Sequence, residues 1–402
     1  MRKALGLAAF AAVLACGAAN AQQVNVKIGV LSDMSSLYAD IGGPGSVAAA
    51  KMAIADFTKD NPNVKVEMIA GDHQNKPDIG SQIANQWYDV DKVDMIIDVP
   101  NSGVALAVSQ VANQKNKVFI VSGAAASDLT GPKCNANTIH WTYDTWMLAN
   151  GTGTAIVKTG GDTWFFLTSD YAFGHALERD TIAAVEKAGG KVLGKVRHPL
   201  NTNDFSSFLL QAQSSKAKVI GLANAGGDTI NSIKQAAEFG IVKGGQSLAG
   251  LLVFASDVAA LGLPTAQGLI LTETWYWDMN DTNRAWTKRW QQERQGKWPT
   301  MIHAGVYAGV LHYLKAAVAL KGNVSDGKTV VAQMKSMPTD DPLFGKGTIR
   351  ADGRKIHPAY LLEVKKPEES KHPGDFYRVR ATIPTEEAFR PLKEGNCPLV
   401  SG

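Results

Sequence analysis

The chain has 402 residues, of which 45% are hydrophobic and 19% are charged, and its formal net charge is +4. A charge this close to neutral gives no electrostatic case for nucleic acid or an anionic membrane as a partner. The length exceeds what one hydrophobic core usually supports, so the chain is expected to form two domains.

The first 21 residues have the pattern of a secretory signal peptide. Two basic residues precede the apolar run 4–15, and small residues follow, ending in the A-x-A cleavage site Ala19-Asn20-Ala21. A membrane span needs about 20 apolar residues, which is more than this run supplies. Lipid attachment at Cys16 is the alternative, but a leucine stands where a lipoprotein site usually has a small residue. Cleavage would lower the net charge to +2, because both basic residues are removed.

The first half of the mature sequence alternates short Val- and Ile-rich segments with longer helical ones. This alternation predicts right-handed βαβ crossovers and a parallel sheet with helices on both faces. Strands are predicted at Val24–Leu31, Val64–Ala70, Val93–Val99 and Lys117–Val121, and helices at Gly45–Phe57, Ile79–Tyr88 and Val104–Asn116.

The same alternation starts again after the turn-rich interval 127–137, so we predict a second doubly wound parallel sheet. Its strands are expected at Thr163–Thr168, Lys191–Val196, Lys218–Leu222 and Leu251–Phe254, and its helices at Ala172–Ala188, Phe205–Gln213 and Thr229–Phe239.

The last third of the chain contains helices without a sheet of their own. A strand at Gly268–Thr274 leads into Trp275-Tyr276-Trp277, and Gly347–Val364 is predicted as a hairpin that rejoins the second unit. The intervening helices are expected to return and cover the first sheet, so that the chain passes between the units more than once. They are predicted at Thr282–Arg294, Met301–Leu320 and Thr329–Met337.

Several short stretches form a recognisable set over residues 26–363. The opening strand Lys27-Ile28-Gly29-Val30-Leu31 is followed by Met34-Ser35-Ser36, and other members are the stretches 100–103, 122–125, 169–174 and 305–308. Together they resemble the type I periplasmic binding proteins of the leucine/isoleucine/valine-binding group. The segment His140-Trp141-Thr142-Tyr143-Asp144 is similar to a subgroup associated with uptake of aromatic and other organic acids.

The resemblance implies an α/β fold with two doubly wound parallel-sheet lobes joined by three crossings, which close on a ligand by hinge motion. The expected division is a first lobe of 22–141 and 275–346, a second lobe of 142–274 and 347–385, and a tail of 386–402. It further implies a monomeric periplasmic protein that captures a small carboxylate for an ABC permease of the inner membrane, with no nucleic acid, cofactor or metal involved.

In the first lobe, ligand-binding residues are expected in the loops after the strands, because ligands of open α/β sheets lie beyond the carboxyl ends of the strands. Ser102 falls where the family holds the ligand carboxylate, and a hydroxyl at a helix start suits an anion. The alternative is a simple helix cap. Gly123, Ala124 and Ala125 let a ligand approach the backbone closely, although Ala125 stands where amino-acid binders of the family have a threonine.

In the second lobe, Phe173 falls where the family places an aromatic ring against the ligand, and Tyr171 lies beside it. Asn224 belongs to a small-residue loop, and Asp257 lies near the family's acidic residue for the ligand amine. Capping of the following helix is the alternative for Asp257. Because binding pockets are mostly apolar and aromatic rings stack on planar ligands, we add the residues at predicted strand ends, namely Tyr38, Tyr143 and Trp275.

Two cysteines would remain after cleavage, Cys134 and Cys397. An even count in an oxidising compartment predicts a disulfide, and this one would tie the C-terminus to the middle of the chain. Two free buried thiols are the alternative.

Enzyme signatures are incomplete in this sequence. The glycine pattern of 43–48 fits a dinucleotide fingerprint, but about a dozen residues separate it from the preceding strand, whereas the fingerprint follows the strand directly. The sequence has no G-x-S-x-G, H-E-x-x-H or P-loop motif, and its eight histidines are scattered. Binding without turnover is therefore predicted, with an extracellular sensor as the alternative and an exported enzyme as a more remote one.

Overall fold

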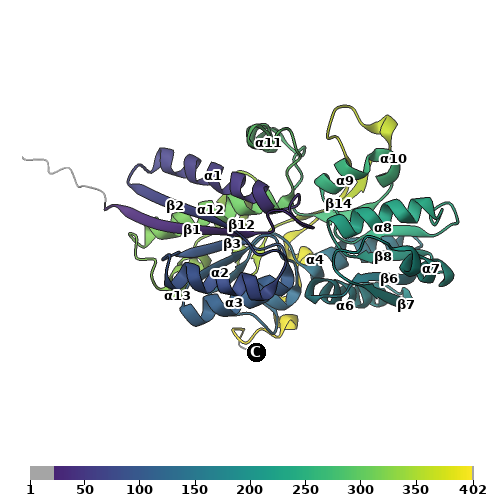
Figure 1. Ribbon diagram of the computed structural model, residues 1–402, viewed down its shortest axis with the longest axis horizontal. Coiled ribbons are helices and arrows are strands. Elements are labelled where there is room, and N and C mark those ends of the chain that lie inside the picture. Colours follow the sequence, from purple (N-terminus) through teal and green to yellow (C-terminus); the bar gives the residue numbers. More distant parts are fainter. Residues whose placement is uncertain (1–21, 401–402) are drawn as a thin grey trace, which may run out of the picture.

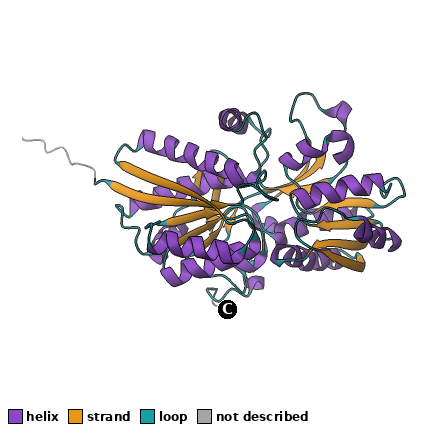
Figure 2. Cartoon of the chain, viewed as in Figure 1, coloured by secondary structure: helices purple, strands orange, loops and turns teal. Residues whose placement is uncertain are grey.

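The computed structural model describes residues 22–400, so the predicted leader and Cys16 lie outside the described residues. The chain forms two α/β lobes that lie side by side along the long axis of the molecule (Figure 1). In each lobe the strands lie between layers of helices (Figure 2). No helix within the described range is both long and apolar enough to span a bilayer.

The sheet of lobe 1 has five parallel strands in the order β2-β1-β3-β4-β5. Its central strands are short and wholly buried, because helices cover both faces and leave no solvent face for polar side chains. The strands are β1 (Val24–Ser32), β2 (Val64–Asp72), β3 (Met95–Asp98), β4 (Val118–Val121) and β5 (Thr138–His140).

Two hydrophobic cores lie on opposite faces of this sheet. Ile97 packs into the core that α12 (Met301–Ala319) completes, whereas its neighbour Ile96 packs against α2 (Pro77–Asp89) and α3 (Ser102–Lys115). Helix α12 is buried along most of its length and lies against α1 (Gly43–Asp60), so the predicted return of the late helices to the first sheet is confirmed. The other late helices are α11 (Asp281–Glu293) and α13 (Gly327–Ser336).

The sheet of lobe 2 is also parallel, in the order β7-β6-β8-β9. The last strand was expected at Leu251–Phe254, but this apolar run follows the strand as a buried loop leading to α9. The strands are β6 (Thr163–Ser169), β7 (Lys191–His198), β8 (Val219–Ala223) and β9 (Ser247–Gly250). The helices are α6 (Ala172–Lys187), α7 (Ser206–Ser214), α8 (Gly227–Glu238), α9 (Ala255–Leu261) and α10 (Leu263–Ala266).

Two antiparallel sheets complete the lobes. Strands β10 (Ile270–Glu273), β14 (Ala359–Val364) and β15 (Tyr377–Ile383) form the one in lobe 2, and β11 (Thr339–Asp341), β12 (Gly345–Ile349) and β13 (Lys355–Ile356) form the one beside α13. The hairpin predicted at Gly347–Val364 is therefore divided, since β12 pairs with β13 but β14 pairs with β10 and β15. Pro358 has no backbone N–H to continue a ladder at this point.

Three segments connect the lobes: 141–144 after β5, 274–280 after β10, and 357–358 between β13 and β14. We propose that the third connection, rather than residue 347, marks the boundary between the lobes, because β12 contacts α13 of lobe 1. The remaining short helices are η1 (Ser127–Thr130), α4 (Thr145–Leu148), η2 (Ala149–Gly153), α5 (Thr154–Lys158), η3 (Pro367–Glu369), α14 (Thr385–Ala388) and η4 (Leu392–Gly395).

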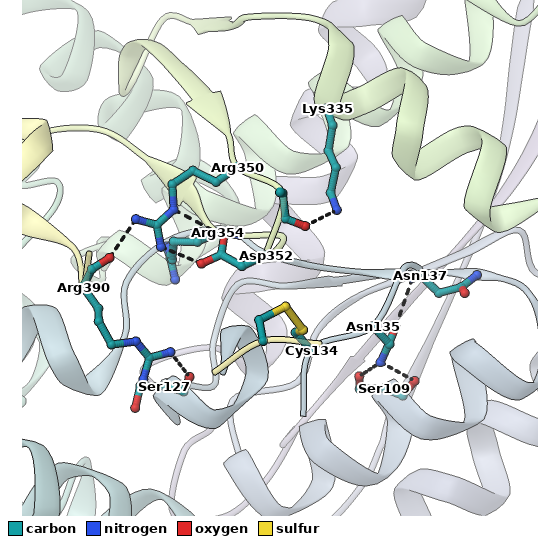
Figure 3. The surroundings of a disulfide bond; sticks show 12 residues. Ser109, Ser127, Cys134, Asn135, Asn137, Lys335, Arg350, Asp352, Arg354 and Arg390 are labelled. Carbon is teal, nitrogen blue, oxygen red and sulfur yellow. Dashed lines mark hydrogen bonds and ion pairs between the residues drawn. A yellow bond between two sulfur atoms is a disulfide. The ribbon is translucent and has the colours of Figure 1, made fainter. Parts of the chain in front are cut away.

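The predicted disulfide is confirmed: Cys134 and Cys397 are bonded, with their Cα atoms 5.6 Å apart. Figure 3 shows the bond next to the loop of Ser127 and the turn of Arg350. It fixes the end of the chain to the loop between η1 and β5 in lobe 1.

Candidate ligand-binding site

A small cavity lies between the lobes, where the carboxyl ends of both parallel sheets meet. Its volume is only about 10 Å³, room for about one water molecule, so the lobes are nearly closed on it in this structure. Lobe 1 and the first crossing contribute Tyr38, Ile41, Pro100, Gly123, Ala125 and Tyr143, and lobe 2 contributes Tyr171, Phe173, Ala225 and Leu252. Four of these ten side chains are aromatic and none is charged, which is the composition expected of a pocket for a small apolar or aromatic molecule.

The wall from lobe 1 is built by an unusual turn after β3. Asp98 and Val99 have φ values of 90° and 57°, a region that non-glycine residues seldom adopt and that recurs at functional sites. The turn places Pro100 against the cavity and starts α3 two residues later. Gly123 lies so close to it that a Cβ atom would approach Pro100 Cα to 2.7 Å.

Ser102 is the first residue of α3, and its Oγ accepts hydrogen bonds from the N–H groups of Ala125 (3.3 Å) and Ala126 (3.2 Å). The helix cap is Asn101, whose side chain accepts the N–H of Val104 at 3.1 Å, so Ser102 is not a simple cap. Ser102 therefore lies directly behind Ala125 of the cavity wall. The first N–H groups of a helix lack intrahelical acceptors and favour an anion.

A pair of tyrosines joins the two lobes across the cavity. The hydroxyls of Tyr38 in lobe 1 and Tyr171 in lobe 2 are 2.5 Å apart. Nearby, the N–H of Gly227 donates to the carbonyl of Leu37, so the backbones of the two lobes also meet. Burial raises the pKa of Tyr38 well above its usual value, and it also raises the pKa of Tyr171. Both hydroxyls therefore stay protonated and can donate hydrogen bonds.

Tyr143 and Phe173 complete the aromatic lining. The hydroxyl of Tyr143 donates to the carbonyl of Gly123 at 2.5 Å, which fixes the ring against the lobe 1 wall. Phe173 lies in the first turn of α6, buried, with its ring centroid 5.9 Å from that of Tyr171. The sequence predicted both residues for the cleft, and the structure brings them together with Tyr38, Gly123 and Ala125.

Buried carboxyl groups surround the cavity without lining it. Burial raises the pKa of Asp98 and of Asp257 to about 7, and that of Asp228 to about 6. Asp98 accepts the hydroxyl of Ser32 at 2.8 Å. These acids are therefore partly protonated near neutral pH and present less negative charge toward the cavity than ionised carboxylates would.

Besides Ser102, which lies behind the wall, four predicted residues do not line this cavity. The carbonyl of Ala124 accepts a hydrogen bond from Nε2 of His140 at 2.8 Å. Inside lobe 2, the side chain of Asn224 accepts a hydrogen bond from the hydroxyl of Thr229 at 2.8 Å. Asp257 accepts the N–H of Phe254 at 3.0 Å at the start of α9, the capping role that the sequence left open. Trp275 packs edge-on against Trp286, with ring centroids 5.6 Å apart.

Sequence reasoning missed Ile41, Pro100, Ala225 and Leu252 as lining residues. Pro100 and Ala225 belong to loops that the strand-end rule had singled out, so that rule could have found them. Leu252 was assigned to a strand, and Ile41 has no recognisable signal in the sequence.

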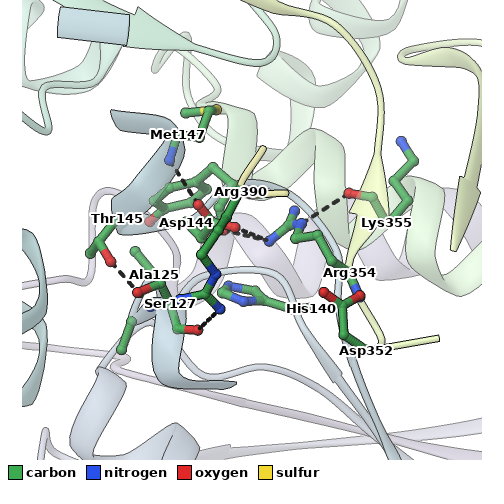
Figure 4. A network of polar contacts seen from close by, with 12 residues as sticks. Ala125, Ser127, His140, Asp144, Thr145, Met147, Asp352, Arg354, Lys355 and Arg390 are labelled. Atoms are coloured by element: carbon green, nitrogen blue, oxygen red, sulfur yellow. Dashed lines mark hydrogen bonds and ion pairs between the residues drawn. The ribbon is translucent and has the colours of Figure 1, made fainter. Parts of the chain in front are cut away.

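A buried arginine supports the cavity from the hinge side (Figure 4). Arg354 is fully buried, and its guanidinium donates to the carbonyl of Tyr143 at 2.8 Å and lies 3.6 Å from a carboxylate oxygen of Asp144. Asp144 in turn caps α4 by accepting the N–H of Met147 at 2.8 Å. The first crossing is thereby held by a charge from the turn between β12 and β13, and burial lowers the pKa of Arg354 to about 10.

One group of side chains within residues 22–400 has the spacing of metal ligands, namely Asp278, His372 and Asp375. Asp278 pairs with Arg284 and Asp375 with Lys365, so each carboxylate already has a basic partner. None of the three lines the cavity.

Comparison with known proteins identifies relatives along most of the chain. Residues 25–371 match the family described as periplasmic binding protein. A periplasmic binding protein from Burkholderia mallei is 52% identical, with 94% of this chain and 99% of that chain covered and a TM-score of 0.90. A branched chain amino acid ABC transporter periplasmic ligand-binding protein from Burkholderia xenovorans LB400 is 39% identical, with 93% and 99% covered and a TM-score of 0.81.

A more distant solved structure agrees in fold. A solute binding protein of an ABC transporter from R. palustris, in complex with benzoate, is 21% identical, with 89% of this chain and 96% of that chain covered and a TM-score of 0.79. Leu/Ile/Val-binding protein homolog 6 of Brucella melitensis is 25% identical over 374 residues, which are 90% of this chain and 93% of that protein. The chain therefore belongs to the periplasmic binding protein family, in the group of type I proteins related to the Leu/Ile/Val-binding proteins.

Proposed function

We propose that this protein is the periplasmic ligand-binding component of an ABC importer and that its ligand is a small aromatic carboxylate. The observation that carries the proposal is the aromatic cavity between the lobes, with Ser102 and the start of α3 directly behind one wall. The helix start and the hydroxyl suit a carboxylate, and the rings of Tyr143 and Phe173 suit a flat apolar body.

The polar groups around the cavity favour an aromatic acid over an amino acid. An amino acid brings an ammonium group that needs an ionised partner, since an unpaired buried charge is costly. The lining has no carboxylate, and Asp257, the family's position for that partner, is bonded to the backbone of Phe254. The relative from R. palustris that binds benzoate supports the same choice.

A branched-chain amino acid is the second candidate. Its support is the relative from Burkholderia xenovorans LB400, described as a branched chain amino acid ABC transporter periplasmic ligand-binding protein. Ionisation of Asp257 together with a side-chain rotation would be required for that ligand, because its known hydrogen bond holds it at the start of α9.

Thermal unfolding of the mature protein with benzoate, leucine and a short aliphatic acid such as butyrate distinguishes these ligands. A ligand that binds only the folded state stabilises it by about 2.7 kcal/mol at a concentration of 100 times Kd. We expect benzoate or a ring-substituted benzoate to raise Tm and butyrate to have no effect. A rise with leucine alone would favour the second candidate, and recovery of a chemically altered ligand after denaturation would contradict binding without turnover.

A further inference from the structure

The C-terminal tail crosses between the lobes after the three connections already described. Strand β15 ends at Ile383 in the antiparallel sheet of lobe 2, whereas Cys397 is bonded to Cys134 in lobe 1. In Figure 1 the yellow C-terminal segment accordingly lies against lobe 1, below α3. We call residues 384–397 the strap.

The strap is attached on both sides. On the lobe 2 side, the carbonyl of Glu387 accepts the side-chain amide of Asn150 at 3.2 Å. On the lobe 1 side, Arg390 donates to the carbonyl of Ser127 at 3.0 Å, and its own carbonyl accepts Arg350 at 2.7 Å (Figure 3). The disulfide then fixes the end of the strap, so the tail is a connection between two anchored points.

Phe389 places the strap in contact with the hinge. Its ring is buried, lies 5.4 Å from the ring of His357 in the third crossing, and carries the guanidinium of Arg354 4.6 Å above it. Arg354 donates to the carbonyl of Tyr143, a cavity residue of the first crossing. Contacts therefore run without a gap from the strap through the hinge to the ligand cavity.

We propose that the strap is a fourth hinge strand, pinned by the Cys134–Cys397 disulfide, which restricts lobe opening and so strengthens ligand retention. The link between β15 and Phe389 is the segment 384–388, so a swing that separates the lobes at this point has to stretch or detach this segment. The disulfide opposes detachment of the lobe 1 end. The inference about retention rests on the proposed function, whereas the inference about opening does not.

Distances between spin labels on the two lobes test the restriction directly. Val90 and Leu210 are exposed residues of lobe 1 and lobe 2, so Val90→Cys and Leu210→Cys provide free thiols for nitroxide labels. Pulsed electron paramagnetic resonance on the ligand-free protein then gives the distribution of distances between the two labels. Because no ligand is present, the outcome does not depend on which molecule the protein binds.

Two variants release the strap in different ways. The double variant Cys134→Ser with Cys397→Ser removes the disulfide. A short Gly-Ser insertion between Pro384 and Thr385 lengthens segment 384–388 and leaves the disulfide intact. The matched control carries the same insertion between Gly244 and Gly245, an exposed turn of lobe 2 that connects nothing across the hinge. The insertion variant keeps the test decisive even where loss of the disulfide impairs folding.

We expect both strap variants to show broader and longer interlobe distances than the wild type and the control. Benzoate, titrated into each, should bind the strap variants roughly 2- to 30-fold more weakly, the range typical of substitutions that act on coupling without touching ligand. A distribution in the folded insertion variant that matches the control would overturn the proposal. Failure of benzoate to bind the wild type would count against the proposed function and leave the distance result intact.

Discussion

Ser102 is the residue on which carboxylate binding is expected to depend most. Replacing it with alanine removes the Oγ that accepts the N–H groups of Ala125 and Ala126. We expect Ser102→Ala to weaken aromatic carboxylate binding by about 0.5–1.5 kcal/mol, the net contribution of one hydrogen bond, because the ligand loses the hydroxyl at the start of α3. Isothermal titration calorimetry measures the change. Ser109→Ala is the matched control, because Ser109 is a buried serine of the same helix that bonds Thr138 instead.

Phe173 supplies a cavity-lining ring of lobe 2, and its centroid lies 5.9 Å from that of Tyr171. We expect Phe173→Ala to weaken binding about tenfold, or roughly 1.4 kcal/mol, because the ligand loses an aromatic contact. Phe208→Ala, a half-buried phenylalanine on α7 of the same lobe, should leave the affinity unchanged. If Phe173→Ala and Ser102→Ala both bind as tightly as the wild type, the ligand occupies a different site.

Asp98 is expected to make the folded protein less stable as pH rises. Burial raises its pKa from 3.8 to about 7, so the folded state binds more protons than the unfolded state between these values. Stability is therefore lost as pH rises through this window, by about 1–4 kcal/mol. We expect Asp98→Asn, which keeps an acceptor for Ser32, to flatten the profile of urea midpoints from acid to neutral pH. The exposed control Asp281→Asn should keep the wild-type slope.

At the scale of elements, the turn after β3 and the glycine after β4 form one packing unit. A Cβ atom on residue 123 would meet Asp98 Oδ1 at 2.8 Å and Pro100 Cα at 2.7 Å, and backbone atoms have little freedom to yield. We expect Gly123→Ala to lower the free energy of unfolding by about 1–3 kcal/mol, as overpacking does. Gly103→Ala should be tolerated, because its nearest neighbours lie at 3.3 Å and 3.5 Å. Urea titration followed by circular dichroism compares the two.

Most elements were predictable because their signals are local. The buried strands β1, β4 and β6 are Val- and Ile-rich or aromatic runs. The prediction placed strand β9 too late in the sequence, at Leu251–Phe254. That segment is as apolar as a strand, but in the structure it is a buried loop. Hydrophobicity reports burial, and it does not distinguish a strand from a loop that fills a core.

The candidate site was predictable to the extent that strand ends define it. Tyr143 and Phe173 were found because each follows a strand or opens a helix at the correct edge. Asn224 and Trp275 satisfy the same rule, yet their side chains turn into their own lobes to bond Thr229 and to pack on Trp286. Side-chain direction depends on tertiary partners that sequence position does not specify.

At the scale of the whole molecule, the disulfide closes a loop of 263 residues. Removing it frees the unfolded chain far more than the folded one, so we expect Cys134→Ser with Cys397→Ser to lose about 2–5 kcal/mol of stability. Guanidinium titration under non-reducing conditions measures the loss. Reduction of the wild type by a dithiol should reproduce the midpoint of the double variant, and a wild-type midpoint in both would contradict the expected contribution.

The position of α12 on the sheet of lobe 1 has a consequence for biogenesis. Strands β1 to β5 are complete by His140, but the helix that covers one face of their sheet begins only at Met301. The four parallel strands of lobe 2 lie within 163–250 and need no such late partner to pair. The half that emerges first from the ribosome must therefore wait for most of the chain before its core can close, and a nascent polypeptide in that state stays unfolded enough to pass through a secretion channel.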